Sequence, residues 1–205
     1  MKTNLHTRVG SGYLWSIAIC CMICFALSSS LFAQTIDIGL TTRRTIGDDI
    51  FGFNTGTTIR GGSSCLNPYL LEKMPLMKPQ IFRFPAGAFS SWYNWREGWV
   101  YDDPNVPQKY KSLTKVPNRL EDYKVLRDAA GATSTILGVN MILSDINEQL
   151  AMLRHADSIG IPVEYVELGN EFFLEGDEDS AYILQVFPEP SDYGKAATIW
   201  ADSIH

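Results

Sequence analysis

Short apolar runs that end in a polar residue recur along this chain, and stretches with helical spacing of apolar residues separate them. Such runs are typical of strands that are buried in a sheet. They predict four strands, at residues 49–54, 80–84, 135–140 and 163–168. Helical spacing predicts three helices, over residues 118–130, over residues 145–160 and from residue 191 or 192 onward.

The predicted helices have recognisable ends and apolar faces. Asn118 followed by Glu121 has the spacing of a capping box. Asp145 with Glu148 marks the start of the second helix, which Gly160 would end. The expected inward residues are Leu120, Tyr123, Leu126 and Ala130 in the first helix, Ile146, Leu150 and Leu153 in the second, and Tyr193, Ala196, Trp200 and Ile204 in the third.

Other segments are less regular. Residues 66–77 predict no more than a helical turn, because Pro68 and Pro75 interrupt it. Residues 88–117 have the composition of a long aromatic and polar loop, and the acidic run 175–179 that of a solvated loop. His155 is expected on the outward, solvated side of its helix.

Strands that alternate with helices indicate parallel pairing through crossovers, so the predicted fold class is α/β. Two architectures have this pattern, an open doubly wound sheet and a (β/α)8 TIM barrel. A doubly wound sheet usually has a glycine-rich phosphate loop after its first strand, and the chain has neither a G-x-G-x-x-G sequence nor a P-loop. A full barrel needs about 250 residues. We therefore predict a TIM barrel of which residues 34–205 contain only about the first four βα units, a truncated N-terminal half.

Residues 1–33 have the order of segments found in a secretory signal peptide. Lys2 and Arg8 give a basic start, residues 17–27 are an uninterrupted apolar run, and Ala33 is a small residue suited to cleavage. A retained membrane anchor is the alternative, although the run is short for a span of about 20 residues. We expect a mature chain that begins at Gln34, is secreted, periplasmic or at the cell surface, and has no stable membrane insertion after cleavage.

The composition of the mature chain limits the classes of partner that it is expected to bind. Without Lys2 and Arg8 it has 15 basic and 23 acidic residues, a net charge of −8. Basic surfaces bind nucleic acids and anionic membranes, so neither is an expected partner. Cys65 is the one cysteine after residue 33, which excludes an internal disulfide and a cysteine–histidine metal cluster. We expect no metal and no cofactor.

Polar residues at the predicted strand ends are the candidates for a functional site. In parallel α/β folds such residues gather at the carboxyl ends of the strands. Amides and carboxylates that bind hydroxyls, together with rings that stack on sugar faces, predict a carbohydrate-binding cleft. The alternative is that the rings only close the mouth of the barrel. The polar candidates are Asn54, Arg83, Asn140, Asn170 and Glu171, and the aromatic ones are Trp92, Tyr93, Trp95, Trp99, Phe172 and Phe173.

Glu171 is the candidate for the chemistry. A glycosidase needs a carboxylic acid that protonates the departing oxygen, and Glu171 stands close behind the predicted strand 163–168. Asn170 would hydrogen-bond a sugar hydroxyl beside the reacting carbon. The alternative is that Asn170 and Glu171 only open a helix, since Asn and Glu are common at helix N-termini.

Two motifs resemble those of known enzymes. Glu-Leu-Gly-Asn-Glu at 167–171 resembles the strand-four Asn-Glu signature of retaining glycoside hydrolases of the large (β/α)8 clan, which includes arabinofuranosidases, xylosidases and cellulases. Residues 83–98, with Arg-Phe-Pro-Ala-Gly-Ala-Phe and then Tyr-Asn-Trp-Arg-Glu-Gly, are similar to the Arg-Trp-Pro-Gly-Gly-x-Phe and Tyr-x-Trp-x-x-Gly segments of α-L-arabinofuranosidases. The resemblance implies that Glu171 is the general acid/base, that Asn170 contacts the substrate 2-hydroxyl, and that Arg83 orients the nucleophile and keeps it ionised.

Departures from the pattern leave the sugar and the linkage open. Ala86 replaces the first glycine of the arabinofuranosidase pattern, and Ser91-Trp92 replace an acidic pair. The first strand also lacks the glutamate that binds the sugar in those enzymes. The resemblance therefore implies the clan, and it does not imply arabinose as the substrate.

A retaining mechanism needs a second carboxylate about 5–5.5 Å from the first, as nucleophile. In the clan this residue comes from the seventh strand, which would lie beyond His205. Glu167 shares a strand face with Glu171, but four residues of strand would put it about 13 Å deeper. We predict instead that Glu167 pairs with an arginine, and that the fragment alone is inactive.

The leading hypothesis is a secreted retaining glycoside hydrolase, an O-glycosyl hydrolase that acts on plant or algal polysaccharide or oligosaccharide. The alternative is a non-catalytic carbohydrate-binding or surface protein derived from a half-barrel. A third possibility is another parallel α/β enzyme in which residues 170–171 only cap a helix. The substrate-binding residues predicted by the leading hypothesis are Asn170, Arg83, Tyr93, Trp95, Asn54 and Phe172.

Overall fold

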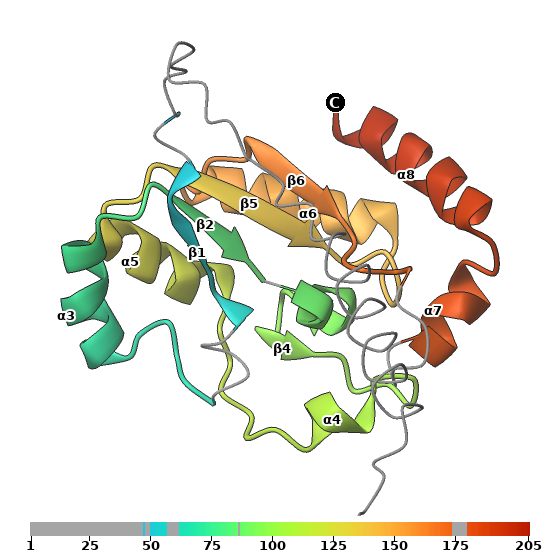
Figure 1. The fold of residues 1–205 in the computed structure, drawn as a ribbon, viewed down its shortest axis with the longest axis horizontal. Coiled ribbons are helices and arrows are strands. Elements are labelled where there is room, and N and C mark those ends of the chain that lie inside the picture. The colour runs from blue at the N-terminus through green and yellow to red at the C-terminus, as the bar shows by residue number, and fades with distance from the viewer. Residues whose placement is uncertain (1–46, 48–49, 57–61, 86, 174–179) are drawn as a thin grey trace, which may run out of the picture. The chain divides into compact units, whose positions relative to one another are not determined.

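A four-stranded parallel sheet forms the centre of the fold in a computed structural model that describes residues 47, 50–56, 62–85, 87–173 and 180–205. All of its pairings are parallel, as predicted. The four predicted strands are confirmed, with ends that differ by a few residues, whereas the predicted signal peptide lies outside the described residues. The strands, drawn in Figure 1, are β1 (Gly52–Asn54), β2 (Ile81–Phe84), β5 (Ser134–Val139) and β6 (Tyr165–Leu168).

The strands lie in the sheet in the order in which they follow along the chain, β1-β2-β5-β6. A doubly wound sheet reverses its direction of growth, whereas a barrel adds each new strand at the same edge. The order therefore favours barrel-type winding over the doubly wound alternative. Within the described part of the chain the sheet is open, because β1 and β6 each pair with one neighbour, and no complete barrel is formed.

Helices connect and cover these strands. The segments between consecutive strands contain α3, α5 and α6, and α3 packs beside α5. None of the helices in the described ranges is long and apolar enough to cross a membrane. The helices are α3 (Pro68–Met77), α4 (Gln108–Lys111), α5 (Leu120–Ala130), α6 (Ile146–Ser158), α7 (Ser180–Val186) and α8 (Pro190–Ile204).

The prediction of a broken turn at residues 66–77 is wrong, since α3 is a continuous helix. Pro68 is its first residue, where a missing N–H removes no helical hydrogen bond. The Asn67 side chain accepts a hydrogen bond from the Tyr69 N–H at 2.9 Å and so caps the helix. Pro75 lies in the last turn, and Lys78 then ends the helix in a left-handed conformation with φ of 51°.

The cap of α5 lies one residue later than predicted. The Arg119 N–H donates to Asp122 Oδ2 at 2.9 Å, so Arg119 is the N-cap residue in place of Asn118. Asn118 is buried instead, where its Oδ1 accepts from the Cys65 N–H and its Nδ2 donates to the Val116 carbonyl at 2.9 Å. The predicted apolar face of α5 is confirmed, because all four of its residues are buried.

The start of α6 is as predicted, with Asp145 Oδ1 accepting from the Asn147 and Glu148 N–H groups at 2.8 and 3.0 Å. Its buried face is only partly as predicted, because Ile146 and Leu150 are half-buried. On α8 all four residues of the predicted face pack against the core. The fully buried residues of α6 are Gln149, Met152, Leu153 and Ala156.

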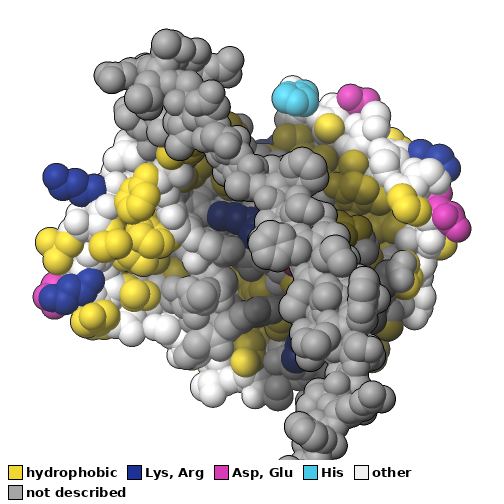
Figure 2. All heavy atoms as spheres, viewed as in Figure 1, with side chains coloured by type: hydrophobic (Ala, Val, Ile, Leu, Met, Phe, Trp, Pro, Cys, Tyr) yellow, Lys and Arg dark blue, Asp and Glu magenta, His cyan; other side chains and the backbone are white. Residues whose placement is uncertain are grey.

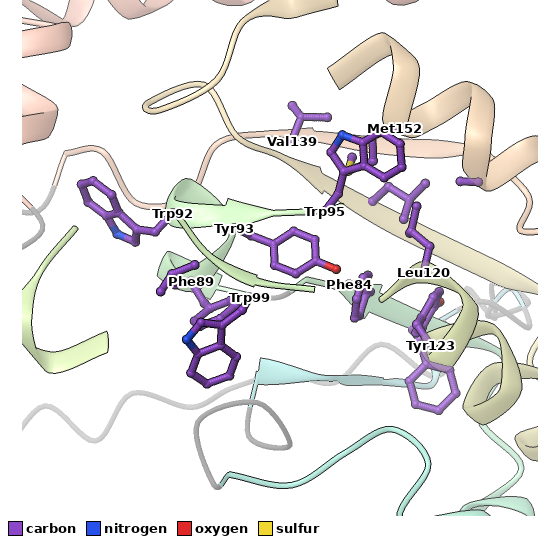
Figure 3. Close-up of a cluster of buried hydrophobic side chains, with 14 of the residues drawn as sticks. Phe84, Phe89, Trp92, Tyr93, Trp95, Trp99, Leu120, Tyr123, Val139 and Met152 are labelled. Atoms are coloured by element: carbon purple, nitrogen blue, oxygen red, sulfur yellow. The ribbon is translucent and has the colours of Figure 1, made fainter. Parts of the chain in front are cut away.

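The segment predicted as a long loop is instead folded. After β2 come the 3-10 helix η3 (Gly87–Trp92), an antiparallel hairpin of β3 (Tyr93–Asn94) and β4 (Trp99–Val100), and α4. Its aromatic side chains are buried, except that of the half-buried Tyr101, and the ring centroids of Phe89 and Trp99 lie 5.6 Å apart in the cluster of Figure 3. These rings fill the core through their size and do not recur at a regular spacing, so this segment of the sequence shows neither a helical nor a strand period.

Alternate residues of the strands pack against the helices. The Phe84 ring stacks on that of Tyr123 from α5, with centroids 4.4 Å apart (Figure 3), and the Tyr123 hydroxyl hydrogen-bonds Thr135 Oγ1 at 2.8 Å. Figure 2 shows further hydrophobic side chains on the surface, gathered over α3 and along α8. The exposed ones on α3 are Tyr69, Leu76 and Met77.

Candidate active site

Residues paired in register on neighbouring parallel strands point to the same side of the sheet. Asn54 of β1 is paired with Arg83 of β2, and Arg83 is paired with Ile136 of β5. Two residues further along β5, Gly138 is paired with Glu167 of β6. One face of the sheet therefore carries Arg83 and Glu167 near the carboxyl ends of strands that are separated only by β5.

Arg83 and Glu167 form an ion pair across β5. Arg83 Nε donates to Glu167 Oε2 at 2.6 Å, and Arg83 Nη2 donates to the other oxygen of the same carboxylate. The strand between them has Gly138 at the position paired with Glu167, so it presents no side chain there. The prediction that Glu167 pairs with an arginine is confirmed.

Asn170 connects this ion pair to Glu171. Its side chain is buried, and its Oδ1 accepts from Arg83 Nη2 at 2.7 Å while its Nδ2 donates to Glu171 Oε2 at 3.2 Å. A line of hydrogen bonds thus runs from Glu167 through Arg83 and Asn170 to Glu171. Glu171 is exposed, and its Oε1 accepts no hydrogen bond from the described residues.

The backbone turns sharply between β6 and Glu171. Gly169 has φ of 81°, and a Cβ atom there would lie 2.3 Å from ring carbons of Phe172, so only glycine fits. Glu171 itself has φ of 51°, a left-handed conformation that is uncommon for a residue with a side chain. This turn directs Glu171 away from the line of the strand.

The expected separation of about 13 Å between Glu167 and Glu171 is wrong, because it assumed one strand running through both. The strand ends at Leu168, and a single guanidinium and a single amide link the two carboxylates. The helix-cap alternative finds no support in the described residues, since Phe172 and Phe173, which directly follow Glu171, lie in a turn and not in a helix. The acidic run 175–179 lies outside the described residues.

A cavity of about 550 Å³ lies beside Glu171. The turn after β6 forms one wall, and the end of α7 with the start of α8 forms the other. Phe172 lines it, as do Phe187 and Tyr193, whose rings contact that of Phe172. Of the predicted site residues, Arg83, Asn170, Glu171 and Phe172 therefore come together at this edge of the sheet.

Three other predicted site residues have their side chains hydrogen-bonded to groups outside this line. Tyr93 is buried in the core, and its hydroxyl donates to the Asn118 carbonyl at 2.7 Å. Asn140 is buried too, and its Oδ1 accepts from the N–H groups of the two residues that follow Met141. Asn54 is exposed, and its side chain accepts from the Gly56 N–H at 3.0 Å.

Thr55 is a residue that the sequence reasoning missed. Its N–H and its hydroxyl both donate to the Arg83 carbonyl, at 3.2 and 2.8 Å, and the residue is buried. Thr55 thereby ties the end of β1 to the backbone that carries the arginine. Its position directly after a strand-ending Asn54 is the signal that would have identified it.

Trp95 belongs to a second polar cluster, between α5 and α6. Its Nε1 donates to Glu148 Oε1 at 2.8 Å, and Arg96 stacks on its ring while donating to the same carboxylate. The His155 ring lies 5.4 Å from that of Trp95 and hydrogen-bonds Glu121 at 2.7 Å. These hydrogen bonds lower the pKa of Glu148, through Arg96, and of Glu121, through His155. His155 lies off the buried face of α6, as predicted, with a side chain that is 35% exposed.

The fold and the site define an α/β protein whose parallel sheet is wound in barrel order and carries a carboxylate–guanidinium–amide–carboxylate line at its carboxyl edge. No protein-family model matches the chain, and no curated protein matches it. In the described ranges no group of three histidine, cysteine, aspartate or glutamate side chains is arranged to hold a metal ion.

Part of the chain is similar to solved α-L-arabinofuranosidases. The enzyme from Thermotoga maritima, solved with arabinose, is 18% identical with a TM-score of 0.36, over 58% of this chain and 32% of its own. Another arabinofuranosidase is 18% identical with a TM-score of 0.36, over 58% and 31%. The GH51 enzyme from Thermotoga petrophila RKU-1 is 17% identical with a TM-score of 0.35, again over 58% and 31%. The match thus spans about a third of the length of these enzymes, and it assigns the chain to no family.

Proposed function

We propose that this chain carries the acid/base half of the active site of a secreted retaining glycoside hydrolase that acts on plant or algal polysaccharide or oligosaccharide. The observation that carries the proposal is the hydrogen-bonded line from Arg83 through Asn170 to the exposed Glu171, at the carboxyl edge of a parallel sheet. Functional groups of parallel α/β enzymes gather at this edge. The Asn-Glu sequence at the end of the fourth strand supports the same assignment.

Glu171 has the geometry of a proton donor. Asn170 holds Oε2 of its carboxyl group at 3.2 Å, while Oε1 is free of hydrogen bonds with the described residues. In the first step Glu171 would protonate the glycosidic oxygen from Oε1, and in the second it would take a proton from the attacking water. Asn170, whose Oδ1 is fixed by Arg83, would donate its remaining N–H to the substrate 2-hydroxyl.

The nucleophile is the missing part of the proposal. We assign it to a glutamate on a later strand beyond His205, which would complete a (β/α)8 barrel and lie about 5–5.5 Å from Glu171. Arg83 Nη1 makes no hydrogen bond with the described residues, so it remains available for that carboxylate. An arginine so placed favours the ionised form of a neighbouring carboxyl group.

The test compares two glutamate-to-glutamine variants of the full-length protein, including the later strand that the proposal requires. Glu171→Gln removes the proton donor, and Glu164→Gln removes an exposed carboxylate just before β6 that is not among the residues lining the cavity. On a panel of 4-nitrophenyl glycosides, Glu171→Gln is expected to lower kcat/KM about 10²–10⁴-fold, while Glu164→Gln changes it less than about threefold. Equal losses in both variants, or no loss in Glu171→Gln, would overturn the proposal.

A second function is favoured by one observation. Glu167 already neutralises Arg83 within the described residues, as expected of a half-barrel that binds carbohydrate without a nucleophile. This non-catalytic protein would bind oligosaccharide and hydrolyse none of the panel. In it, Glu171→Gln would leave the affinity for oligosaccharide within about threefold of that of the original protein.

A further inference from the structure

The cavity beside Glu171 has an inner wall of packed aromatic rings. Phe172 lies 5.7 Å from Phe187 and 5.5 Å from Tyr193 between ring centroids, and Phe187 lies 5.7 Å from Tyr193. The Tyr193 hydroxyl donates to the Leu168 carbonyl at 2.8 Å, at the end of β6. Three mutually packed rings fixed to the strand end form a preorganised surface.

The rim of the cavity is apolar and unusually exposed. Phe173 is 79% exposed and Leu184 is 47% exposed, and both line the cavity together with Pro188 and Pro190. Scattered apolar residues on a surface need no explanation, but these surround a hollow of about 550 Å³. That volume lies in the range of pockets for small molecules.

The polar groups in the cavity accept hydrogen bonds and carry negative charge. Among the described residues that line it, the acids are Glu171 and Glu189, and there is neither lysine nor arginine. The Tyr193 hydroxyl already donates a hydrogen bond to the Leu168 carbonyl, and the Asn170 side chain is hydrogen-bonded to Arg83 and Glu171. The cavity therefore disfavours an anion and suits an uncharged ligand with an O–H group to donate.

A sugar ring is a poor match for these walls. Its several hydroxyls would face Phe173, Leu184 and two prolines without partners, and burying an unpaired polar group is unfavourable. A phenol has one hydroxyl for a carboxylate and an apolar ring for the aromatic wall. Contacts between aromatic rings stabilise a complex beyond the burial of their area.

We propose that the cavity lined by Phe172, Phe173 and Leu184 binds an uncharged phenol, which in the proposed hydrolysis is the leaving group that Glu171 protonates. The second part rests on the proposed function, whereas the binding of the phenol does not. The substrates would accordingly include aryl glycosides, in which the group on the cleaved oxygen is a phenol.

The test measures binding of three probes to the purified chain by isothermal titration calorimetry at pH 7. They are 4-methylphenol, which is uncharged at this pH, 4-methylbenzoate, which has the same ring with a negative charge, and methyl β-xyloside as a sugar. Leu184→Ser and Phe173→Ser alter exposed rim residues. Ile199→Ser is the matched control, because Ile199 is 62% exposed on α8 and is not among the residues that line the cavity.

We expect 4-methylphenol to bind at least tenfold more tightly than either other probe. Each rim variant should weaken its binding about five- to tenfold, and Ile199→Ser should leave it unchanged. No binding of 4-methylphenol, equal binding of 4-methylbenzoate, or equal losses in the rim and control variants would overturn the inference. If 4-methylphenol binds as expected but the full-length protein hydrolyses no glycoside, the proposed function fails and the phenol site remains.

Discussion

The ion pair between Arg83 and Glu167 joins β2 to β6 across β5, and it is the part of the site whose energetic contribution can be worked out most directly. We predict that Glu167→Gln destabilises the chain by about 1–2 kcal/mol. Glutamine has the shape of glutamate and keeps one oxygen that accepts a hydrogen bond, but it loses the charge and the second acceptor. Arg83 would then remain partly buried, with one weakened hydrogen bond to residue 167 beside the one to Asn170.

The magnitude follows from the burial of the pair. Breaking a fully buried ion pair costs about 3–5 kcal/mol, and a hydrogen bond to a charged group contributes about 1.5–3 kcal/mol. The side chains of Arg83 and Glu167 are 22% and 27% exposed, so water screens part of the interaction. Because Glu167→Gln retains one of the two hydrogen bonds, the expected loss in the free energy of unfolding is about 1–2 kcal/mol. This loss lowers the Tm by roughly 3–6 °C in a unit of this size.

The assay is urea unfolding at two protein concentrations, to exclude a contribution from association, with Glu164→Gln as the matched control. Glu164 is exposed just before β6, so its substitution makes the same change in net charge without breaking this pair. The control should stay within about 0.5 kcal/mol of the original chain. If both variants lose the same stability, the pair contributes nothing specific and the reasoning is refuted.

Three further predictions concern the packing and the pH dependence of the fold. Gly138→Ala should destabilise the fold by about 1–3 kcal/mol, because its Cβ would lie 2.9 Å from the Pro85 carbonyl oxygen. Gly194→Ala is the control: its Cβ would enter open space, so it should stabilise the fold by about 0.5–1 kcal/mol. Equal effects of the two variants in thermal unfolding would contradict the packing around Gly138. Because the pKa of Glu148 is lowered in the folded chain, the stability from this carboxylate is present above its ordinary pKa of 4.5 and is lost as the pH falls through the folded value. The loss of stability caused by Glu148→Gln should therefore shrink as the pH falls below 4.5, and a loss of the same size at neutral and at acidic pH would contradict this. Burial raises the pKa of the Cys65 thiol to about 12. In a chain that begins at Gln34, this thiol should therefore react with a disulfide reagent only after unfolding. Rapid reaction of the native chain would refute the burial of Cys65.

Regular periodicity made the central elements predictable. The apolar runs gave all four strands of the sheet, and the spacing of Leu120, Tyr123, Leu126 and Ala130 gave the buried face of α5. The pairing of Glu167 with an arginine was also predictable, because an acid on an inward strand position needs a charged partner. In each case the structure that the local sequence pattern favours is also the one that the tertiary packing requires.

Other features depend on tertiary contacts that leave no pattern in the sequence. Tyr93 and Trp95 have the chemistry of sugar-binding residues, but the hairpin that carries them buries both, and nothing local distinguishes a core ring from a cleft ring. The turn at Gly169 was missed because strand alternation was extended through it. The left-handed Glu171 became visible only from the backbone.

The measurement that tests the central claim most directly is the hydrolysis of two aryl glycosides by the full-length protein and its Glu171→Ala variant. One substrate has the good leaving group 2,4-dinitrophenolate, and the other has phenolate, which needs protonation to depart. The account predicts that kcat/KM of the variant falls about 10²–10⁴-fold for the phenyl glycoside and little for the dinitrophenyl glycoside. Added azide, which attacks the glycosyl-enzyme without a general base, is expected to raise kcat and to yield the glycosyl azide with retained configuration. Equal losses on the two substrates with no azide product would contradict the role of Glu171 as the acid/base.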